Sequence, residues 1–158
     1  MRNRILIRRA VENDLPAITD LFRKTIQTIN SKDYTKEQVK VWSAGADNTK
    51  RWSESIEKQY FILAEIVSVV VGFGSITTDG YLDFMYVHKD YQRVGIARAL
   101  LSEIEKKAVE QKNAEIFSHV SKTAKGFFEK MGYVCREVVT DKAVNGVMFE
   151  NNVMVKKI

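Results

Sequence analysis

A six-residue segment, Gln92-Arg93-Val94-Gly95-Ile96-Ala97, lies between a predicted strand and a long predicted helix. The first N–H groups of a helix have no partner within it, and they lie at the positive end of its dipole. Gly95 lets the backbone approach a ligand closely, and Ala97 adds little bulk. Arg93 and Arg98 supply charge-assisted donors. The pattern indicates a site for a pyrophosphate, although an ordinary helix start beside two arginines has the same pattern.

The spacing of apolar residues predicts helices and strands along the whole chain. Strands are expected at 4–9, 60–66, 68–76, 81–88, 115–120, 133–139 and 147–155. Helices are expected from Asn13 or Asp14 to Thr28, from Thr35 to Gly45, at 49–59, at 95–111, and from Ser121 or Thr123 to just before Gly132. The strand-helix-strand order across 81–120 predicts parallel strands there, and hairpins predict antiparallel strands elsewhere. We therefore predict an α+β (mixed α/β) fold in a single domain, 1–158, whose mixed central sheet of about 6–7 strands is flanked by helices.

Composition excludes several classes of protein. The chain has 158 residues and a net charge of +5, and it has one cysteine, Cys135, so no internal disulfide forms. No Cys/His cluster has metal-ligand spacing, and we expect no metal. The apolar run at the start is too short for a signal sequence, and residues 61–73 are too short to span a membrane. We expect a cytoplasmic protein with a solvated basic surface. The sequence has no stretch in which basic residues alternate with aromatic ones, so a nucleic-acid partner is not expected.

Two sequence blocks together resemble the GNAT superfamily of N-acetyltransferases. The segment 92–97 matches the family's cofactor signature Q/R-x-x-G-x-G/A, and residues 124–133, AKGFFEKMGY, are similar to A-x-x-F-Y-E-K-x-G-F. The predicted order of elements agrees over essentially the whole chain. The opening helices, with Tyr34 to Val39 and Trp42, are similar to one bacterial subgroup. The resemblance implies a GNAT-like domain that uses acetyl-CoA without a metal. It also implies a splay, in which strands 4 and 5, expected at 81–88 and 115–120, separate from each other.

The resemblance also implies where coenzyme A binds. The pantetheine arm would lie in the splay and pair with the strand backbone near Met85 and Val87, and a backbone N–H there would polarise the acyl carbonyl. The pyrophosphate would rest on the turn 93–97, and Ser121 takes the place of a family asparagine. The implied cofactor-binding residues are Met85, Val87, Gln92, Arg93, Val94, Gly95, Ile96, Ala97, Arg98, Ser121, Phe127, Phe128 and Lys130.

Acyl transfer to an amine requires a base, because about one alkylammonium in a thousand is neutral at pH 7. Asp83 is the first choice, since many family members carry an acidic residue at this point of strand 4. His119, expected near the splay, is the second, because histidine titrates in the useful range. For each of these two residues a structural role without catalysis remains open. Asp83 fits a surface carboxylate paired with a lysine, and His119 fits a packed or exposed strand residue.

The acid that protonates the leaving thiolate has several candidates, because Phe128 stands where the family commonly has tyrosine. Ser121, Tyr86 and Tyr133 are the alternatives, and a thiolate, whose acid has a pKa near 8.5, can also leave unaided. We expect Tyr133 to bury its ring in the core.

The acceptor pocket is expected to come from the first two helices and strand 4. Its predicted residues are Phe22, Ile26, Tyr34, Gln38 and Trp42. Phe22 and Trp42 also fit a plain core position, and for Phe22 the core is favoured.

The predicted function is transfer of an acetyl group to a primary amine of a small molecule or peptide. The alternatives are an acyl-CoA-binding module with little catalysis, suggested by Phe128, and acetylation of an amine on RNA or protein, suggested by the positive charge. A homodimer stays open.

Overall fold

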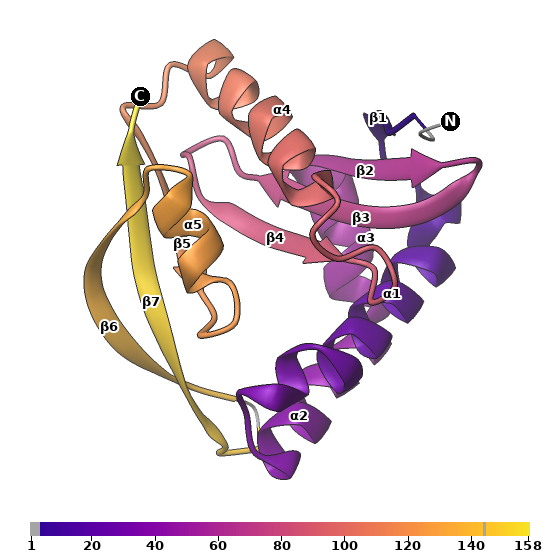
Figure 1. Ribbon diagram of the computed structural model, residues 1–158, viewed down its shortest axis with the longest axis vertical. Helices are drawn as coiled ribbons and strands as arrows, with labels where there is room; N and C mark the ends of the chain where they lie inside the picture. Colours follow the sequence, from indigo (N-terminus) through magenta and orange to yellow (C-terminus); the bar gives the residue numbers. More distant parts are fainter. Residues whose placement is uncertain (1–3, 144) are drawn as a thin grey trace.

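The computed structural model describes residues 4–143 and 145–158 (Figure 1). Its strands are β1 (Leu6–Arg9), β2 (Tyr60–Ile66), β3 (Val69–Ile76), β4 (Leu82–Val87), β5 (Glu115–Val120), β6 (Val134–Lys142) and β7 (Met148–Lys157). Its α-helices are α1 (Leu15–Thr28), α2 (Lys36–Ser43), α3 (Thr49–Lys58), α4 (Ile96–Glu110) and α5 (Lys125–Lys130). The elements predicted from the sequence are all present, with ends that differ by a few residues.

Local side-chain chemistry sets the helix starts. Thr35 Oγ1 accepts the Gln38 N–H at 3.1 Å, and the Gln38 side chain accepts the Thr35 N–H at 3.0 Å, so a capping box begins α2. Pro16 lies in the first turn of α1, where its missing N–H leaves no bond unmade. At α4 no side chain caps the helix, and Gly95 occupies the N-cap position with φ +92°.

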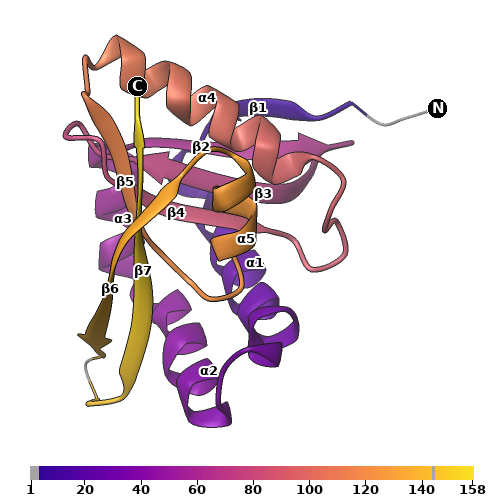
Figure 2. The same cartoon turned by 60° about the vertical axis from the view of Figure 1, so that its left-hand side comes forward.

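The strands form two antiparallel sheets, one ordered β1-β2-β3-β4 and the other β5-β7-β6. The parallel pairing predicted across 81–120 is confined to one bridge between Tyr81 and Phe117. Beside it, Ser118 Oγ donates to the Leu82 carbonyl at 2.7 Å, across the join between β4 and β5. Beyond that point β4 and β5 separate. The strands of the second sheet run at a steep angle to the strands of the first (Figure 2). The predicted splay between strands 4 and 5 is therefore present.

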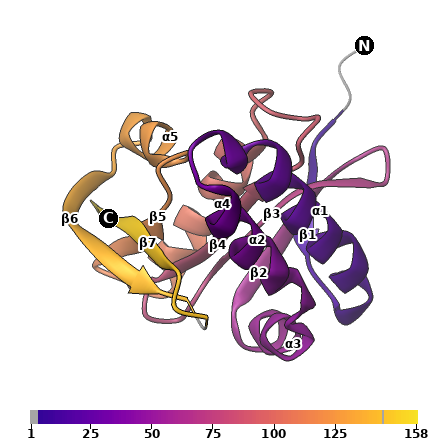
Figure 3. The same ribbon diagram turned by 90° about the horizontal axis from the view of Figure 1, so that it is seen from below.

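Two apolar cores lie on opposite faces of the first sheet. One core packs beneath α4 and includes Ile96, Leu100 and Ile104, while the other packs beneath α1 and α3 and includes Phe22 and Trp52. Seen from below, α1 and α3 lie over one face of the first sheet, α2 packs against α1, and the β6–β7 hairpin stands to the side (Figure 3). The α+β fold class predicted from the sequence is confirmed. Within the described ranges, no helix is both long and apolar enough to cross a membrane.

Asp14 is the residue just before α1, and its side chain bonds to Arg8 of β1. Its carboxylate accepts hydrogen bonds from the Arg8 guanidinium at 2.8 and 2.9 Å and from the Val11 N–H at 2.8 Å. The Arg8 bonds, more than the Val11 bond, hold the pKa of Asp14 below its ordinary value. Asp14 therefore stabilises the fold above the ordinary aspartate pKa of about 3.9, and this contribution is lost as the pH falls through the lower folded-state pKa.

We expect Asp14→Asn to lower the free energy of unfolding by about 1 kcal/mol at pH 7, a value reduced by the exposure of Arg8. The difference from the unsubstituted protein shrinks toward pH 3, because below the ordinary aspartate pKa of about 3.9 the unfolded state gains the proton and the advantage of the folded carboxylate declines. Urea unfolding at both pH values measures it. Asp20→Asn, which removes an exposed pair with Lys24 on the same helix, serves as the control. An Asp14→Asn difference that does not change with pH would contradict the argument.

Candidate active site

The turn between β4 and α4 presents backbone N–H groups outward. Arg93 has φ +60° and Gly95 has φ +92°, so two left-handed residues bend the chain into the helix. Among the described residues, no atom outside the turn lies within 4 Å of a Cβ built at Gly95. The first N–H groups of α4 lack a side-chain cap. This is the open, positively polarised helix start that the sequence predicts for a pyrophosphate.

The side chains of this turn divide into two groups. Gln92 Nε2 donates to the carbonyls of Val87 and His88 at 2.8 and 3.2 Å, so Gln92 fastens the turn to the end of β4. Ile96 is buried in the core under α4. The other predicted cofactor residues of the turn are at least partly accessible: Arg93, Val94, Gly95, Ala97 and Arg98. Gln92 and Ile96 therefore position the turn, and the accessible residues are left to meet a ligand.

The free edge of β4 faces the splay. His88 N–H donates to the Val71 carbonyl at 2.8 Å, and bonding in an antiparallel ladder alternates. Tyr86 therefore bonds toward β3, while the backbone groups of Met85 and Val87 point toward the other edge. The Val87 carbonyl accepts from Thr25 Oγ1 at 3.0 Å as well as from Gln92. The backbone of Met85 and the N–H of Val87 remain directed into the splay, and the pairing of pantetheine there stays a prediction.

Asp83 sits in a bulge of β4. Ser75 pairs with Phe84 and Ile76 with Leu82, so Asp83 is the extra residue. The bulge directs its side chain to α3, where Oδ2 accepts from Gln59 Nε2 at 2.8 Å and Oδ1 lies 3.5 Å from Arg51. The paired role left open for Asp83 is thus observed, with arginine rather than lysine as its partner.

His119 lies on β5 and belongs to a polar cluster. Its Nδ1 is 3.3 Å from Asp141 Oδ2 on β6, and the same oxygen accepts from Asn151 Nδ2 at 2.6 Å. The Tyr81 ring meets His119 edge to face at 5.8 Å. Burial raises the pKa of Tyr81 to about 12, with smaller effects from Asp83, Arg51 and Asp141. Tyr81 therefore stands between the two predicted bases, at the closed end of the splay.

An aromatic group links α2 to the second sheet. Tyr34 and Trp42 meet edge to face at 5.0 Å, and Phe149 of β7 lies 6.2 and 6.1 Å from them. Trp42 Nε1 donates to the Tyr86 hydroxyl at 3.2 Å. Burial raises the pKa values of Tyr34 and Tyr86, which keeps both protonated at neutral pH. Phe149 lies on a predicted strand, 147–155, but the sequence did not assign it to the pocket, because its contacts with Tyr34 and Trp42 join distant parts of the chain.

Polar contacts reinforce the same link. Gln38 Nε2 donates to the Met148 carbonyl at 2.9 Å, and the Tyr34 hydroxyl accepts the Lys122 N–H at 2.9 Å. The predicted pocket residues Tyr34, Gln38 and Trp42 thus gather on the side of the splay opposite α4. Phe22 and Ile26 are different, because they are 4% and 0% exposed in the core beneath α1. Phe22 packs edge to face on the Tyr86 ring at 4.9 Å, as the core alternative for Phe22 anticipated, and Ile26 lies in the same core.

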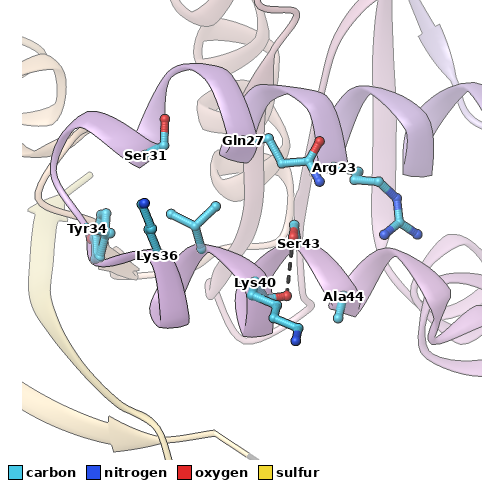
Figure 4. Close-up of a pocket in the computed structure, with 9 residues that line it drawn as sticks. Arg23, Gln27, Ser31, Tyr34, Lys36, Lys40, Ser43 and Ala44 are labelled. Atoms are coloured by element: carbon cyan, nitrogen blue, oxygen red, sulfur yellow. Dashed lines mark hydrogen bonds between the residues drawn. The ribbon is translucent and has the colours of Figure 1, made fainter.

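A separate groove of about 590 Å³ lies between α1 and α2 (Figure 4). It is lined by Arg23, Gln27, Ser31, Tyr34, Lys36, Val39, Lys40, Ser43 and Ala44. Of the predicted pocket residues only Tyr34 borders it. Neither of the two predicted bases, Asp83 and His119, lines this groove.

The second motif forms α5 and its flanks. Phe128 is 2% exposed and packs edge to face on Tyr133 at 5.2 Å, whereas Phe127 is partly buried and Lys130 is exposed. Ser121 Oγ accepts the Ala124 N–H at 3.2 Å and so helps to begin the helix. The Tyr133 hydroxyl points to Glu105 of α4 at 3.4 Å, and its ring is in the core as expected. Cofactor contact at Ser121, Phe127, Phe128 and Lys130 stays a prediction.

These features define an α+β domain whose parted strands lie beside an open, uncapped helix start. The family model for the acetyltransferase (GNAT) domain matches residues 30–155. The chain is 32% identical over 131 residues to the uncharacterised N-acetyltransferase YafP of Escherichia coli K12, covering 83% of this chain and 82% of that protein. The protein therefore belongs to the GNAT acetyltransferases, and it is an acyltransferase.

Solved structures agree with this assignment. A GCN5-related N-acetyltransferase from Rhodopseudomonas palustris superposes with a TM-score of 0.94 at 27% identity, over 100% of this chain and 99% of that one. The PaiA N-acetyltransferase of Thermoplasma acidophilum, solved in complex with coenzyme A, gives a TM-score of 0.76 at 19% identity over 98% and 99%. The second likeness supports the fold alone.

Proposed function

We propose that this chain transfers the acetyl group of acetyl-CoA to a primary amine of a small molecule or peptide, as one catalytic unit over residues 1–158. The observation that carries the proposal is the alignment of two backbone features. The free edge of β4 at Met85 and Val87 leads directly to the open helix start at Gly95. An extended pantetheine can pair with the first while its pyrophosphate meets the second.

The exposed arginines of the turn strengthen this assignment. Arg93 and Arg98 are both exposed beside the uncapped start of α4. Their guanidinium groups add positive charge to the partial charge of the helix terminus. On the acceptor side, the backbone N–H directed into the splay can stabilise the negative charge that develops on the thioester oxygen. No metal is required for this chemistry.

The leaving thiolate has a reduced set of proton donors. Phe128 has no acidic proton, and the Tyr133 hydroxyl is turned toward Glu105 on α4. Tyr86 remains, because its hydroxyl accepts from Trp42 and keeps its own proton to donate. Ser121, with the Tyr34 hydroxyl beside it, is the other donor near the start of α5. We propose Tyr86 or unaided departure for this step, since a thiolate is a fair leaving group.

The setting is part of the proposal. We propose a cytoplasmic bacterial enzyme, and Cys135, as the single cysteine, fits a reducing compartment. The acceptor is a small-molecule or peptide amine, and the mild basic charge is assigned to a solvated surface.

Thermal unfolding with coenzyme A and an amine-panel assay test the proposal together. Ligand at a hundred times its dissociation constant adds about 2.7 kcal/mol of stability, which for a chain of this size raises Tm by roughly 5–10 °C. We expect this shift together with acetyl-CoA-dependent release of free thiol for some amines. Binding without turnover would favour the acyl-CoA-binding module, and a salt-dependent RNA gel shift would favour an RNA-borne acceptor. Absence of the thermal shift would overturn the proposed function.

A further inference from the structure

Three polar side chains from three different strands converge on one face of the second sheet. His119 comes from β5, Asp141 from β6 and Asn151 from β7. Phe149 and Asn151 are two residues apart on β7, so they share a face, and Asp141 pairs directly with Phe149. That is also the face on which Phe149 meets Tyr34 and Trp42 of the predicted acceptor pocket. The polar cluster therefore borders the acceptor side of the splay.

The contacts within the cluster determine which ring nitrogen of His119 carries the proton. Asn151 Nδ2 donates to Asp141 Oδ2 at 2.6 Å, and this bond, followed by that of His119, holds the pKa of Asp141 below its ordinary value. Asp141 is thus a carboxylate at neutral pH and can only accept. The 3.3 Å contact consequently places the ring proton on Nδ1. The lone pair of the neutral ring is then on Nε2.

Asp83, the other predicted base, has both carboxylate oxygens engaged. One of its oxygens accepts from Gln59 and the other faces Arg51, and its side chain is 14% exposed. His119 is 36% exposed, and among residues 4–143 and 145–158 its Nε2 makes no hydrogen bond. The charged and titratable groups near His119 include Asp141 and Glu137 from β6, Tyr81 just before β4, Asp83 from β4 and Arg51 from α3.

We infer that His119 is the base for the incoming amine and that Asp141, held by Asn151, is its positioning residue. This rests on the proposed function. His119 Nε2 takes one proton from the ammonium group, and the neutral nitrogen forms a C–N bond with the thioester carbonyl carbon. The C–S bond breaks and its electron pair leaves with sulfur. Of the two protons lost by nitrogen, one ends on the thiolate and the other passes from the imidazolium to solvent.

The test combines kinetics with a spectroscopic readout that needs no acceptor. With the best amine from the panel, His119→Gln lowers kcat about 100-fold, the lower end of what a general base contributes. Asp141→Asn lowers kcat about 10-fold with KM for acetyl-CoA unchanged, and Asp141→Glu recovers part of it. Glu150→Gln removes a carboxylate from the neighbouring position of β7, on its other face, and leaves kcat unchanged.

The second readout is the ¹⁵N NMR spectrum of the two histidines, His88 and His119. The Nδ1–H tautomer of His119 dominates at high pH in the unsubstituted protein, and Asp141→Asn reduces its population. An unchanged tautomer in Asp141→Asn, or kcat unchanged in His119→Gln, would overturn the inference. If the unsubstituted protein turns over no amine, the proposed function fails instead, and the NMR result still decides whether Asp141 orients the ring.

Discussion

Gly95→Ala weakens coenzyme A binding about 100-fold, and Gly95→Asp abolishes it at millimolar ligand. A hundredfold change corresponds to roughly 2.8 kcal/mol. The Cβ of alanine enters the open space where the helix start has to approach the pyrophosphate, because nothing else among the described residues fills that space. Aspartate adds a negative charge to the same place. Isothermal titration with coenzyme A measures both effects.

A second glycine separates ligand contact from backbone strain in this prediction. Gly132 also has φ +92°, so alanine there meets the same conformational penalty of about 1–2 kcal/mol. A Cβ at Gly132 meets only the flexible Lys156 side chain, at 3.5 Å. Gly132→Ala should therefore lower Tm about as much as Gly95→Ala while leaving the dissociation constant unchanged. Equal loss of affinity in the two variants would show that strain, rather than contact, is responsible.

Local chemistry explains why the sequence predicts the helices and the turn so well. The Thr35–Gln38 capping box and Gly95 act within a few residues of their own positions. The same holds for β5, whose predicted bounds match the structure. The splay between β4 and β5 was not predicted from local sequence patterns. Its prediction followed from the family resemblance. In the structure Ser118 bonds across the closed end of the splay to the Leu82 carbonyl, and no local pattern marks that serine.

The site was harder to predict wherever it depends on distant residues. Asp141 lies 22 residues from His119, on a strand that is separated from β5 by β7. Their contact follows from the curvature of that sheet, which periodicity does not encode. The bulge at Asp83 is a matter of register between β3 and β4, and it turns the predicted base toward Arg51. Phe22 and Ile26 have the right helical spacing for either a pocket or a core, and only packing distinguishes the two.

The close packing of α4 on β3 leads to the other large expected effect. A Cβ at Gly72 would lie 2.8 Å from Ile96 Cγ2, 3.1 Å from Leu100 Cδ1 and 3.1 Å from the Tyr86 carbonyl. Gly72→Ala therefore displaces α4 and lowers the free energy of unfolding by about 3 kcal/mol, at the upper end for overpacking. Ile96 directly follows Gly95, so the displacement also moves the helix start. Coenzyme A should bind about 10-fold more weakly.

A double-mutant cycle with Ile96→Ala identifies the atoms responsible. Ile96→Ala removes Cγ2, the atom nearest to the new methyl group, so Gly72→Ala should cost at least 1 kcal/mol less in that background than alone. Gly126→Ala is the matched control, because its Cβ meets nothing within 4 Å among the described residues. That change should be neutral or stabilising. Urea unfolding and calorimetric titration of the four cycle members give both quantities. Additive free energies would mean that Ile96 Cγ2 is not the atom that the methyl group displaces. Unchanged coenzyme A affinity in Gly72→Ala would mean that the first sheet does not set the position of the pyrophosphate turn.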